Sequence, residues 1–178
     1  IGRVSVAAIA SNGLVAVAPD YIGMNGYGAA STQSHTAFVG EQAAIASWDA
    51  INAAKVILDE LGEVEISNKV VIAGSSQGTH AAIFSELYGP YYAPQWDVVA
   101  IAGLAPPTDM IRNATNSVTH FTNHTFYNAG FMAGYNEWYG LNNNLTDAVR
   151  DEFMQRSIQF MKDLGIPTQG CNYQEQQR

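Results

Sequence analysis

The sequence predicts an α/β fold in which helices flank a parallel sheet. Apolar runs of strand character alternate along the chain with helical segments, and this order favours parallel strands joined by right-handed crossovers. A Gly-x-Ser-x-Gly pentapeptide stands between one of these runs and the next helix. Hydrophobic residues make up 47% of the 178 residues, which is enough to bury a core, and charged residues make up only 13%.

The first part of the chain is expected to contain a helix, a strand and a loop. A short apolar helix is predicted over residues 3–11, with Asn12-Gly13 as its stop signal. The valine-rich run over residues 14–18 is typical of a strand that is buried on both faces. Residues 23–36 are rich in Gly, Ser and Thr, so we expect a loop there.

The next elements complete the predicted sheet. Apolar side chains at helical spacing across residues 39–61 predict a long amphipathic helix, and a glycine follows it directly. Residues 69–73 and 98–104 are predicted to form two further buried strands. The helix between them is expected to reach about Tyr88, because Gly89-Pro90 and Ala93-Pro94 should break the chain.

The composition changes after the third predicted strand. Residues 111–144 are rich in Asn, Thr, Tyr, Phe and Gly and contain no strong strand run, whereas residues 147–164 are predicted to be a helix. We therefore divide the chain into a core over residues 1–107 and a helical lid or cap insertion over residues 108–178. The aromatic side chains of the insertion either line a cleft or only pack this small layer.

The pentapeptide Gly74-Ser75-Ser76-Gln77-Gly78 directly follows the second predicted strand. A Gly-x-Ser-x-Gly between a strand and a helix is the pattern of a nucleophile elbow. The sharp turn should hold Ser76 in a sparsely populated conformation, and Gly74 and Gly78 should remove β-carbons that would collide across it. Ser76 is then the candidate nucleophile, and the backbone N–H of Gln77 should face an oxyanion. In the alternative interpretation, Ser76 only caps the helix of a glycine-rich turn.

With these motifs the chain resembles the serine hydrolases of the α/β-hydrolase fold, and within them the secretory lipase and esterase group. The segments that carry the resemblance are residues 14–23, 46–54, 74–82 and 102–109. The resemblance implies that carboxylic esters are hydrolysed through an acyl-enzyme on Ser76. It also implies a catalytic triad in the chain order serine, acid, histidine.

The chain departs from the pattern of that fold at both ends. The strands after which the triad acid and histidine would lie are not visible before Arg178, and the first strands of the fold would precede Ile1. The sequence is therefore expected to be an internal segment of a larger hydrolase, incomplete at both ends, with the triad acid and histidine outside it.

The other candidates for acid, base or metal ligand in the chain are less well placed. They are Asp20 and Asp109, which follow predicted strands, and the four histidines His35, His80, His120 and His124. His80 should lie one helical turn past Ser76 and below it, so we expect a core histidine. The last two histidines could share a metal, but no nearby acid or cysteine completes a ligand set. No metal and no cofactor are predicted.

Charge and the remaining motifs bear on partners and location. The net charge is −8 and no basic stripe occurs, so nucleic acid is not an expected partner. Glycosylation sequons at Asn113, Asn123 and Asn144, the single Cys171 and the low lysine content favour a secreted or periplasmic protein. The expected partners are a small-molecule or lipid ester, a transient lipid interface and the remaining parts of the same hydrolase.

Two other functional classes stay open at this point. A serine peptidase or an acyltransferase on the same fold needs the same acyl-enzyme, so the elbow does not separate these activities from an esterase. A non-catalytic binding protein would keep the fold without the chemistry.

Overall fold

The structure is a computed structural model that describes residues 2–24, 35–62, 64–119, 131, 134–140 and 159. The chain forms two compact units. The first unit consists of Ile1–Asp20 and Gly40–Pro107, and the second of Tyr21–Val39 and Thr108–Arg178. The Gly-x-Ser-x-Gly pentapeptide belongs to the first unit.

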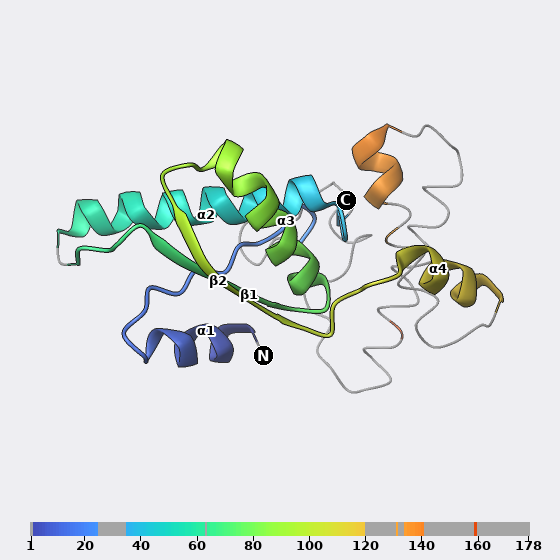
Figure 1. The fold of residues 1–178 in the computed structure, drawn as a ribbon, viewed down its shortest axis with the longest axis horizontal. Coiled ribbons are helices and arrows are strands. Elements are labelled where there is room, and N and C mark those ends of the chain that lie inside the picture. The colour runs from blue at the N-terminus through green and yellow to red at the C-terminus, as the bar shows by residue number, and fades with distance from the viewer. Residues whose placement is uncertain are drawn as a thin grey trace. The chain divides into compact units, whose positions relative to one another are not determined.

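Two parallel strands form the described sheet of the first unit (Figure 1). Strand β1 spans Lys69–Ser75 and strand β2 spans Asp97–Leu104, so two of the three predicted strands are confirmed. In the register of the pair, Gly74 lies opposite Gly103 and Ser75 lies opposite Leu104. The last residues of both strands therefore meet at one edge of the sheet.

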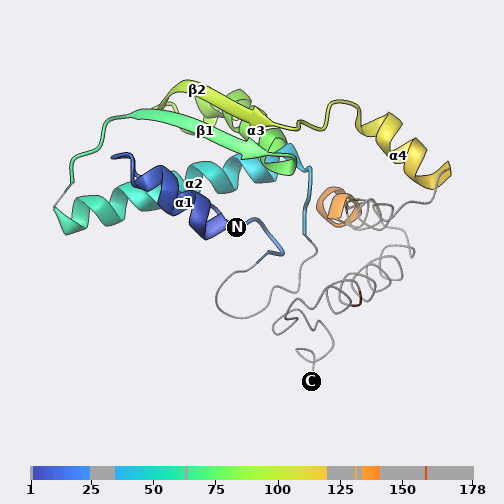
Figure 2. The ribbon, with the colours of Figure 1, turned by 90° about the horizontal axis from the view of Figure 1, so that it is seen from below.

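Helix α3, Gln77–Tyr92, connects the strands and packs against both of them. The two strands run side by side with α3 against them in Figure 2 as well. Helix α2, Gly40–Leu61, packs on α3. The two helices approach closely at Gly40, where a β-carbon would collide with the ring of Phe84. Since parallel strands cannot be joined by a tight turn, α3 is the crossover that the predicted order requires.

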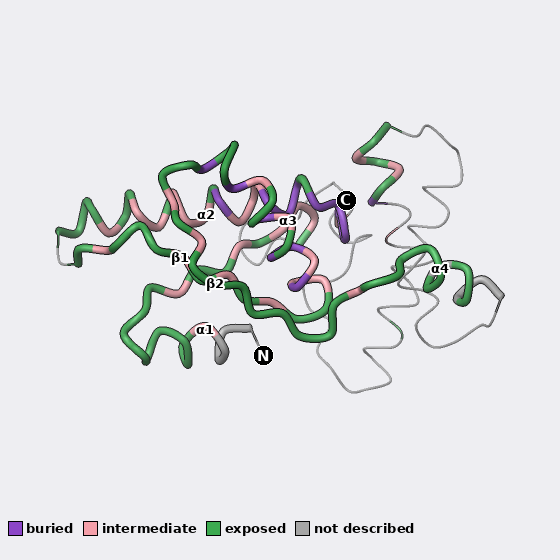
Figure 3. Tube along the Cα trace, viewed as in Figure 1, coloured by how far each residue is buried: buried purple, intermediate pink, exposed green. Residues whose placement is uncertain are grey.

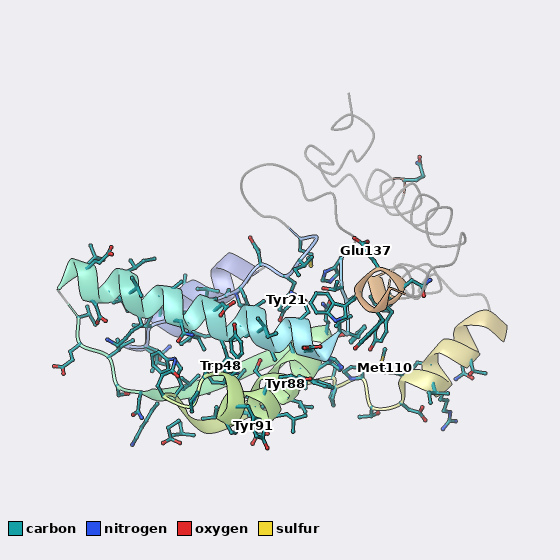
Figure 4. All side chains as sticks on the ribbon, turned by 90° about the horizontal axis from the view of Figure 1, so that it is seen from above. Tyr21, Trp48, Tyr88, Tyr91, Met110 and Glu137 are labelled. Atoms are coloured by element: carbon teal, nitrogen blue, oxygen red, sulfur yellow. The ribbon has the colours of Figure 1, made fainter. Side chains whose placement is uncertain are left out.

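Trp48 is the centre of the contact between α2 and α3. Its side chain lies between the two helices (Figure 4), it is 0% exposed, and its Nε1–H donates a 2.8 Å hydrogen bond to the carbonyl oxygen of Ser85. A β-carbon at Gly89 would lie only 2.8 Å from Trp48 Cζ2, so the indole occupies the space that this glycine leaves. Within the first unit, the buried residues of the trace in Figure 3 lie mainly on α2 and α3.

The predicted first helix is confirmed, but the strand predicted after it is wrong. Helix α1 spans Gly2–Ala10, and the chain turns through Gly13 at φ 79°. Residues 14–18 belong to no strand in the described structure, and Leu14 and Val15 are exposed. Apolar composition indicates only that side chains favour burial, whereas a strand also needs a neighbouring backbone with which to pair.

The expectation that the strands are buried on both faces is also wrong. Val71 and Val99 are 57% and 51% exposed, whereas Val70 and Ile72 on the opposite face of β1 are half-buried. Successive side chains of a strand point to opposite faces, so this alternation shows that only one face is covered. A continuous apolar run in the sequence does not reveal which face has a neighbour.

Helix α3 continues through the position where a break was expected. It includes Pro90 and ends at Tyr92, and the N–H of Ala93 donates to the carbonyl of Gly89 at 2.9 Å. A proline this close to the end of a helix removes one backbone donor and leaves few turns beyond it to disturb. The predicted break at Gly89-Pro90 is therefore wrong, whereas the predicted break at Ala93-Pro94 coincides with the end of the helix.

The second unit is helical in most of its described part after Thr108. Helix α4 spans Met110–Thr119, and residues 134–139 are also helical. The predicted helix over residues 147–164 lies outside the described residues except for Gln159, and Cys171 lies outside them as well. No helix in the described part of the chain is long and apolar enough to span a bilayer.

Candidate active site

Ser76 is the single residue between the end of β1 and the start of α3. The predicted direct passage from strand to helix is thus present. Ser76 is exposed and has φ 53° and ψ −116°. For a residue other than glycine, such a conformation costs about 1–3 kcal/mol and persists only where the surroundings hold it.

Backbone hydrogen bonds on both sides fix this conformation. The Ser76 N–H donates to the carbonyl of Leu104, the last residue of β2, at 2.8 Å. The Ser76 carbonyl accepts from the N–H groups of Thr79 and His80 in the first turn of α3, at 2.9 and 3.3 Å. The backbone of Ser76 is therefore tied to a strand end and to a helix start, while its side chain stays exposed.

The side chain of Ser76 does not act as a helix cap. Ser76 occupies the N-cap position of α3, yet its hydroxyl makes no capping hydrogen bond to the described N–H groups of the helix. An N-cap serine usually accepts from the second or third N–H of its helix. The geometry thus disagrees with the interpretation of the pentapeptide as a turn in which Ser76 only caps the helix.

The two glycines of the motif have different roles. A β-carbon at Gly74 would overlap the carbonyl group of Gly78 and lie 2.7 Å from the backbone nitrogen of Thr79. A β-carbon at Gly78 would meet nothing within 4 Å outside its own helix. The expectation that both glycines relieve a collision is confirmed for Gly74 and wrong for Gly78, because only the first faces the opposite arm of the turn.

Thr79 is a residue of the site that sequence reasoning missed. It is buried at 4% exposure, and its Oγ1 lies 2.9 Å from the carbonyl oxygen of Gly74 and 2.8 Å from that of Leu104. The hydroxyl thus bridges the ends of β1 and β2 directly beneath the turn. A hydroxyl residue three positions after the motif serine was the available signal, but its partners are set by the pairing of the strands.

Gln77 is the first residue of α3 and is half-buried. The N–H groups at the start of a helix point away from the helix body, and the helix dipole places partial positive charge there. Such a terminus stabilises negative charge on a neighbouring group. The predicted contact between the Gln77 N–H and an oxyanion is compatible with this position and stays a prediction.

His80 lies in the first turn of α3, beyond Ser76. Its ring is tilted against that of Phe84, with 4.5 Å between the ring centroids. Burial lowers the pKa of the His80 imidazole from its ordinary value of 6.5, because desolvation disfavours the charged form.

The remaining candidates lie elsewhere in the chain. In the second unit, Nδ1 of His35 lies 3.1 Å from the carbonyl oxygen of Ile22. Asp109 accepts a hydrogen bond from the N–H of Arg112 at 2.9 Å, so its carboxylate caps α4. The candidates outside the described residues are His120, His124, Asn123 and Asn144.

Two further candidates of the sequence analysis are described by the structure. Asn113 is exposed on α4. Asp20 is also exposed and is the last residue of the N-terminal segment of the first unit. Among the described residues, no three His, Cys, Asp or Glu side chains gather as a metal site would require.

Comparisons with known proteins bear on the family and on the fold. The sequence profile of the secretory lipase family matches residues 1–166. Among curated proteins, none matches the sequence. The crystal structure of a proposed hydrolase from Legionella pneumophila is similar, with a TM-score of 0.60 and 22% sequence identity. The similarity covers 77% of this chain and 38% of the Legionella protein, so the matched part spans well under half of the length of that neighbour. The shared architecture supports an α/β fold.

Proposed function

The chain belongs to the secretory lipase family, and we propose that it hydrolyses carboxylic esters through an acyl-enzyme on Ser76. The observation that carries this proposal is the conformation of Ser76, at φ 53° and ψ −116° between β1 and α3. A strained serine that is exposed and fixed by its backbone, rather than by its hydroxyl, is suited to nucleophilic attack. The family and the α/β fold support the same assignment.

The proposed reaction has two steps. In the first, the Ser76 Oγ bonds to the ester carbonyl carbon while a base removes the hydroxyl proton, and the carbonyl oxygen becomes an oxyanion near the Gln77 N–H. The bond to the alcohol oxygen then breaks, and the alcohol leaves with that proton. In the second step, water attacks the acyl-enzyme in the same way and releases the acid. Each oxyanion donor typically lowers the barrier by about 3–4 kcal/mol.

The other parts of the machinery are proposed for the whole protein that contains this chain. We assign neither the triad acid nor the histidine to a described residue. Residues 108–178 are proposed to act as the lid over the ester-binding site, and the family name favours a secreted protein. A small-molecule or lipid ester is the proposed substrate, with contact to a lipid interface where the ester is a lipid.

A fluorophosphonate probe tests the nucleophile directly. We expect the whole protein to be labelled at Ser76, and Ser76→Ala to abolish labelling and reduce ester turnover by at least about 10³-fold, as loss of a catalytic serine does. Ser75→Ala is the matched control, because Ser75 is the exposed last residue of β1 in the same pentapeptide. Intact-mass analysis and hydrolysis of short-chain nitrophenyl esters give the two readouts.

The same experiment separates the alternatives. Labelling that persists in Ser76→Ala and disappears in Ser75→Ala would contradict the assignment of the nucleophile. A labelled protein that cleaves peptide anilides faster than esters would be a peptidase, and one that transfers its acyl group to an added alcohol would be an acyltransferase. A folded protein without labelling would contradict the proposed nucleophile and favour a binding protein.

A further inference from the structure

We propose that Thr79 is a positioning residue that holds Ser76 in its reactive conformation, an inference that rests on the proposed function of Ser76. Thr79 is 4% exposed, so it does not contact a substrate from solvent. Its N–H and its hydroxyl bond to residues at the turn, and its methyl group lies against Gly103 of β2. It therefore acts through the serine rather than on the ester.

The polar contacts of Thr79 form a closed ring around the turn. The Thr79 N–H donates to the Ser76 carbonyl at 2.9 Å, and the Ser76 N–H donates to the Leu104 carbonyl at 2.8 Å. The Thr79 hydroxyl completes the ring by donating to the Leu104 carbonyl at 2.8 Å, and it shares its proton with the Gly74 carbonyl at 2.9 Å. The Leu104 carbonyl, with its two lone pairs, thus receives one donor from each side of the turn.

The methyl group of Thr79 has a separate contact. A β-carbon built at Gly103 would lie 2.5 Å from Thr79 Cγ2, and its next neighbours would be Thr79 Oγ1 at 3.4 Å and Cβ at 3.5 Å. The methyl therefore lies against the backbone of β2, in the space that Gly103 leaves open. This contact adds to the two hydrogen bonds of the hydroxyl, which by themselves hold the rotamer that reaches both strand ends.

The consequence for the reaction concerns geometry and not binding. Without the hydroxyl, the strand ends and the first turn of α3 are joined by fewer bonds, and Ser76 can relax toward an ordinary backbone conformation. The fraction of molecules with the serine in position to attack then falls, so kcat and the rate of fluorophosphonate labelling should drop while KM changes little.

The test compares Thr79→Val with Thr79→Ser in the whole protein. Thr79→Val keeps the shape and loses the hydroxyl, and we expect kcat and labelling rate to fall about tenfold or more, within the roughly 100-fold that a misplacement of about 1 Å can cost. Thr79→Ser keeps the hydroxyl and should retain both rates within about threefold, even if its Tm falls through loss of the buried methyl. Wild-type rates in Thr79→Val, or equal rate losses in both variants, would overturn the proposal.

A second pair of variants decides the matter if Thr79→Val does not fold. Gly103→Ala should push Thr79 out of position and slow labelling, whereas the double variant Gly103→Ala/Thr79→Ser should recover it, because the clashing methyl is gone and the next contacts are 3.4 Å or longer. No recovery in the double variant would overturn the proposal. If the wild-type protein is not labelled at Ser76, the proposed function fails and this inference with it; if the wild type is labelled, only the role of Thr79 is at stake.

Discussion

The two ends of helix α3 use the same device for different purposes. At the first end, Gly74 allows the chain of β1 to pass against the backbone of Gly78 and Thr79. At the second end, Gly89 allows the indole of Trp48 to lie against the helix, with 2.8 Å between Cζ2 and the position of a β-carbon. Each glycine permits a close approach that any side chain would prevent.

The neighbour that approaches determines what each end does. At the first end the neighbour is backbone, and the result is a strained residue, Ser76, whose side chain is left exposed. At the second end the neighbour is a fully buried side chain whose N–H donates to Ser85, and no residue near it has a positive φ among those described. The first end stores strain at the candidate site, and the second supplies packing that stabilises the helix pair.

The largest effect is expected at the first end. Gly74→Ala should destabilise the protein by at least about 3 kcal/mol, more than the roughly 1–3 kcal/mol typical of an overpacked core, because the colliding atoms are backbone and cannot rotate away. Any folded fraction should label slowly with fluorophosphonate, since the turn must open to admit the methyl group. Chemical denaturation and labelling rate measure the two effects.

Gly78→Ala is the matched control within the same motif. Its β-carbon would meet nothing within 4 Å outside its own helix, and alanine favours a helix more than glycine does, so stability should stay within about 1 kcal/mol of the wild type. Equal damage from Gly74→Ala and Gly78→Ala would show that the motif glycines act alike and that the described turn is wrong.

The contrast between these glycines also shows which features of the turn can be predicted from the sequence. The pattern located the turn because a strand, a serine and a helix in succession are a local feature of the chain. It could not separate Gly74 from Gly78, since the collision depends on how the two arms of the turn fold back on each other. The role of Thr79 could not be predicted for a related reason. Its hydrogen-bond partners, the carbonyls of Gly74 and Leu104, come together only when β1 pairs with β2.

A smaller loss of stability is expected from a substitution at the second end of α3. Gly89→Ala would bring a methyl group against Trp48, and overpacking of about 1–3 kcal/mol should exceed the gain of up to about 1 kcal/mol from helix propensity. The labelling rate per folded molecule should match that of the wild type, because Ser76 and its hydrogen bonds lie at the other end of α3. If Gly89→Ala slowed labelling as strongly as Gly74→Ala, the division of roles between the ends would fail.

The errors outside α3 have the same origin as the missed threonine. Residues 14–18 have the composition of a buried strand, but no described strand pairs with them. The exposed side chains of Val71 and Val99 likewise show that composition indicates a preference for burial and not the neighbour that satisfies it. Elements whose signals are local, such as α1 and α2, were predicted within one residue or two of their observed ends.

The smallest expected effect concerns the pH dependence of the two ends. Burial lowers the pKa of His80 from 6.5, so the unfolded chain takes up a proton more readily than the folded one once the pH falls below about 6.5. Stability should therefore decrease through this range until the pH passes the folded pKa, and His80→Gln should lessen the decrease. At the other end, the hydrogen bond that the Tyr92 hydroxyl donates to the Asp49 carboxylate raises the pKa of Tyr92 from its ordinary value of 10.0.

Tyr92→Phe is the control for the pH dependence of stability, because Tyr92 titrates far above the pH range in which His80 does. A raised pKa removes stability only as the pH rises above about 10, so Tyr92→Phe should follow the wild-type slope between pH 7.5 and 5. Urea denaturation of the wild type and of both variants at several pH values in that range gives the slopes. A His80→Gln slope equal to that of the wild type would mean that the imidazole is as easily protonated in the fold as in water, and the first end of α3 would lose its distinct acid response.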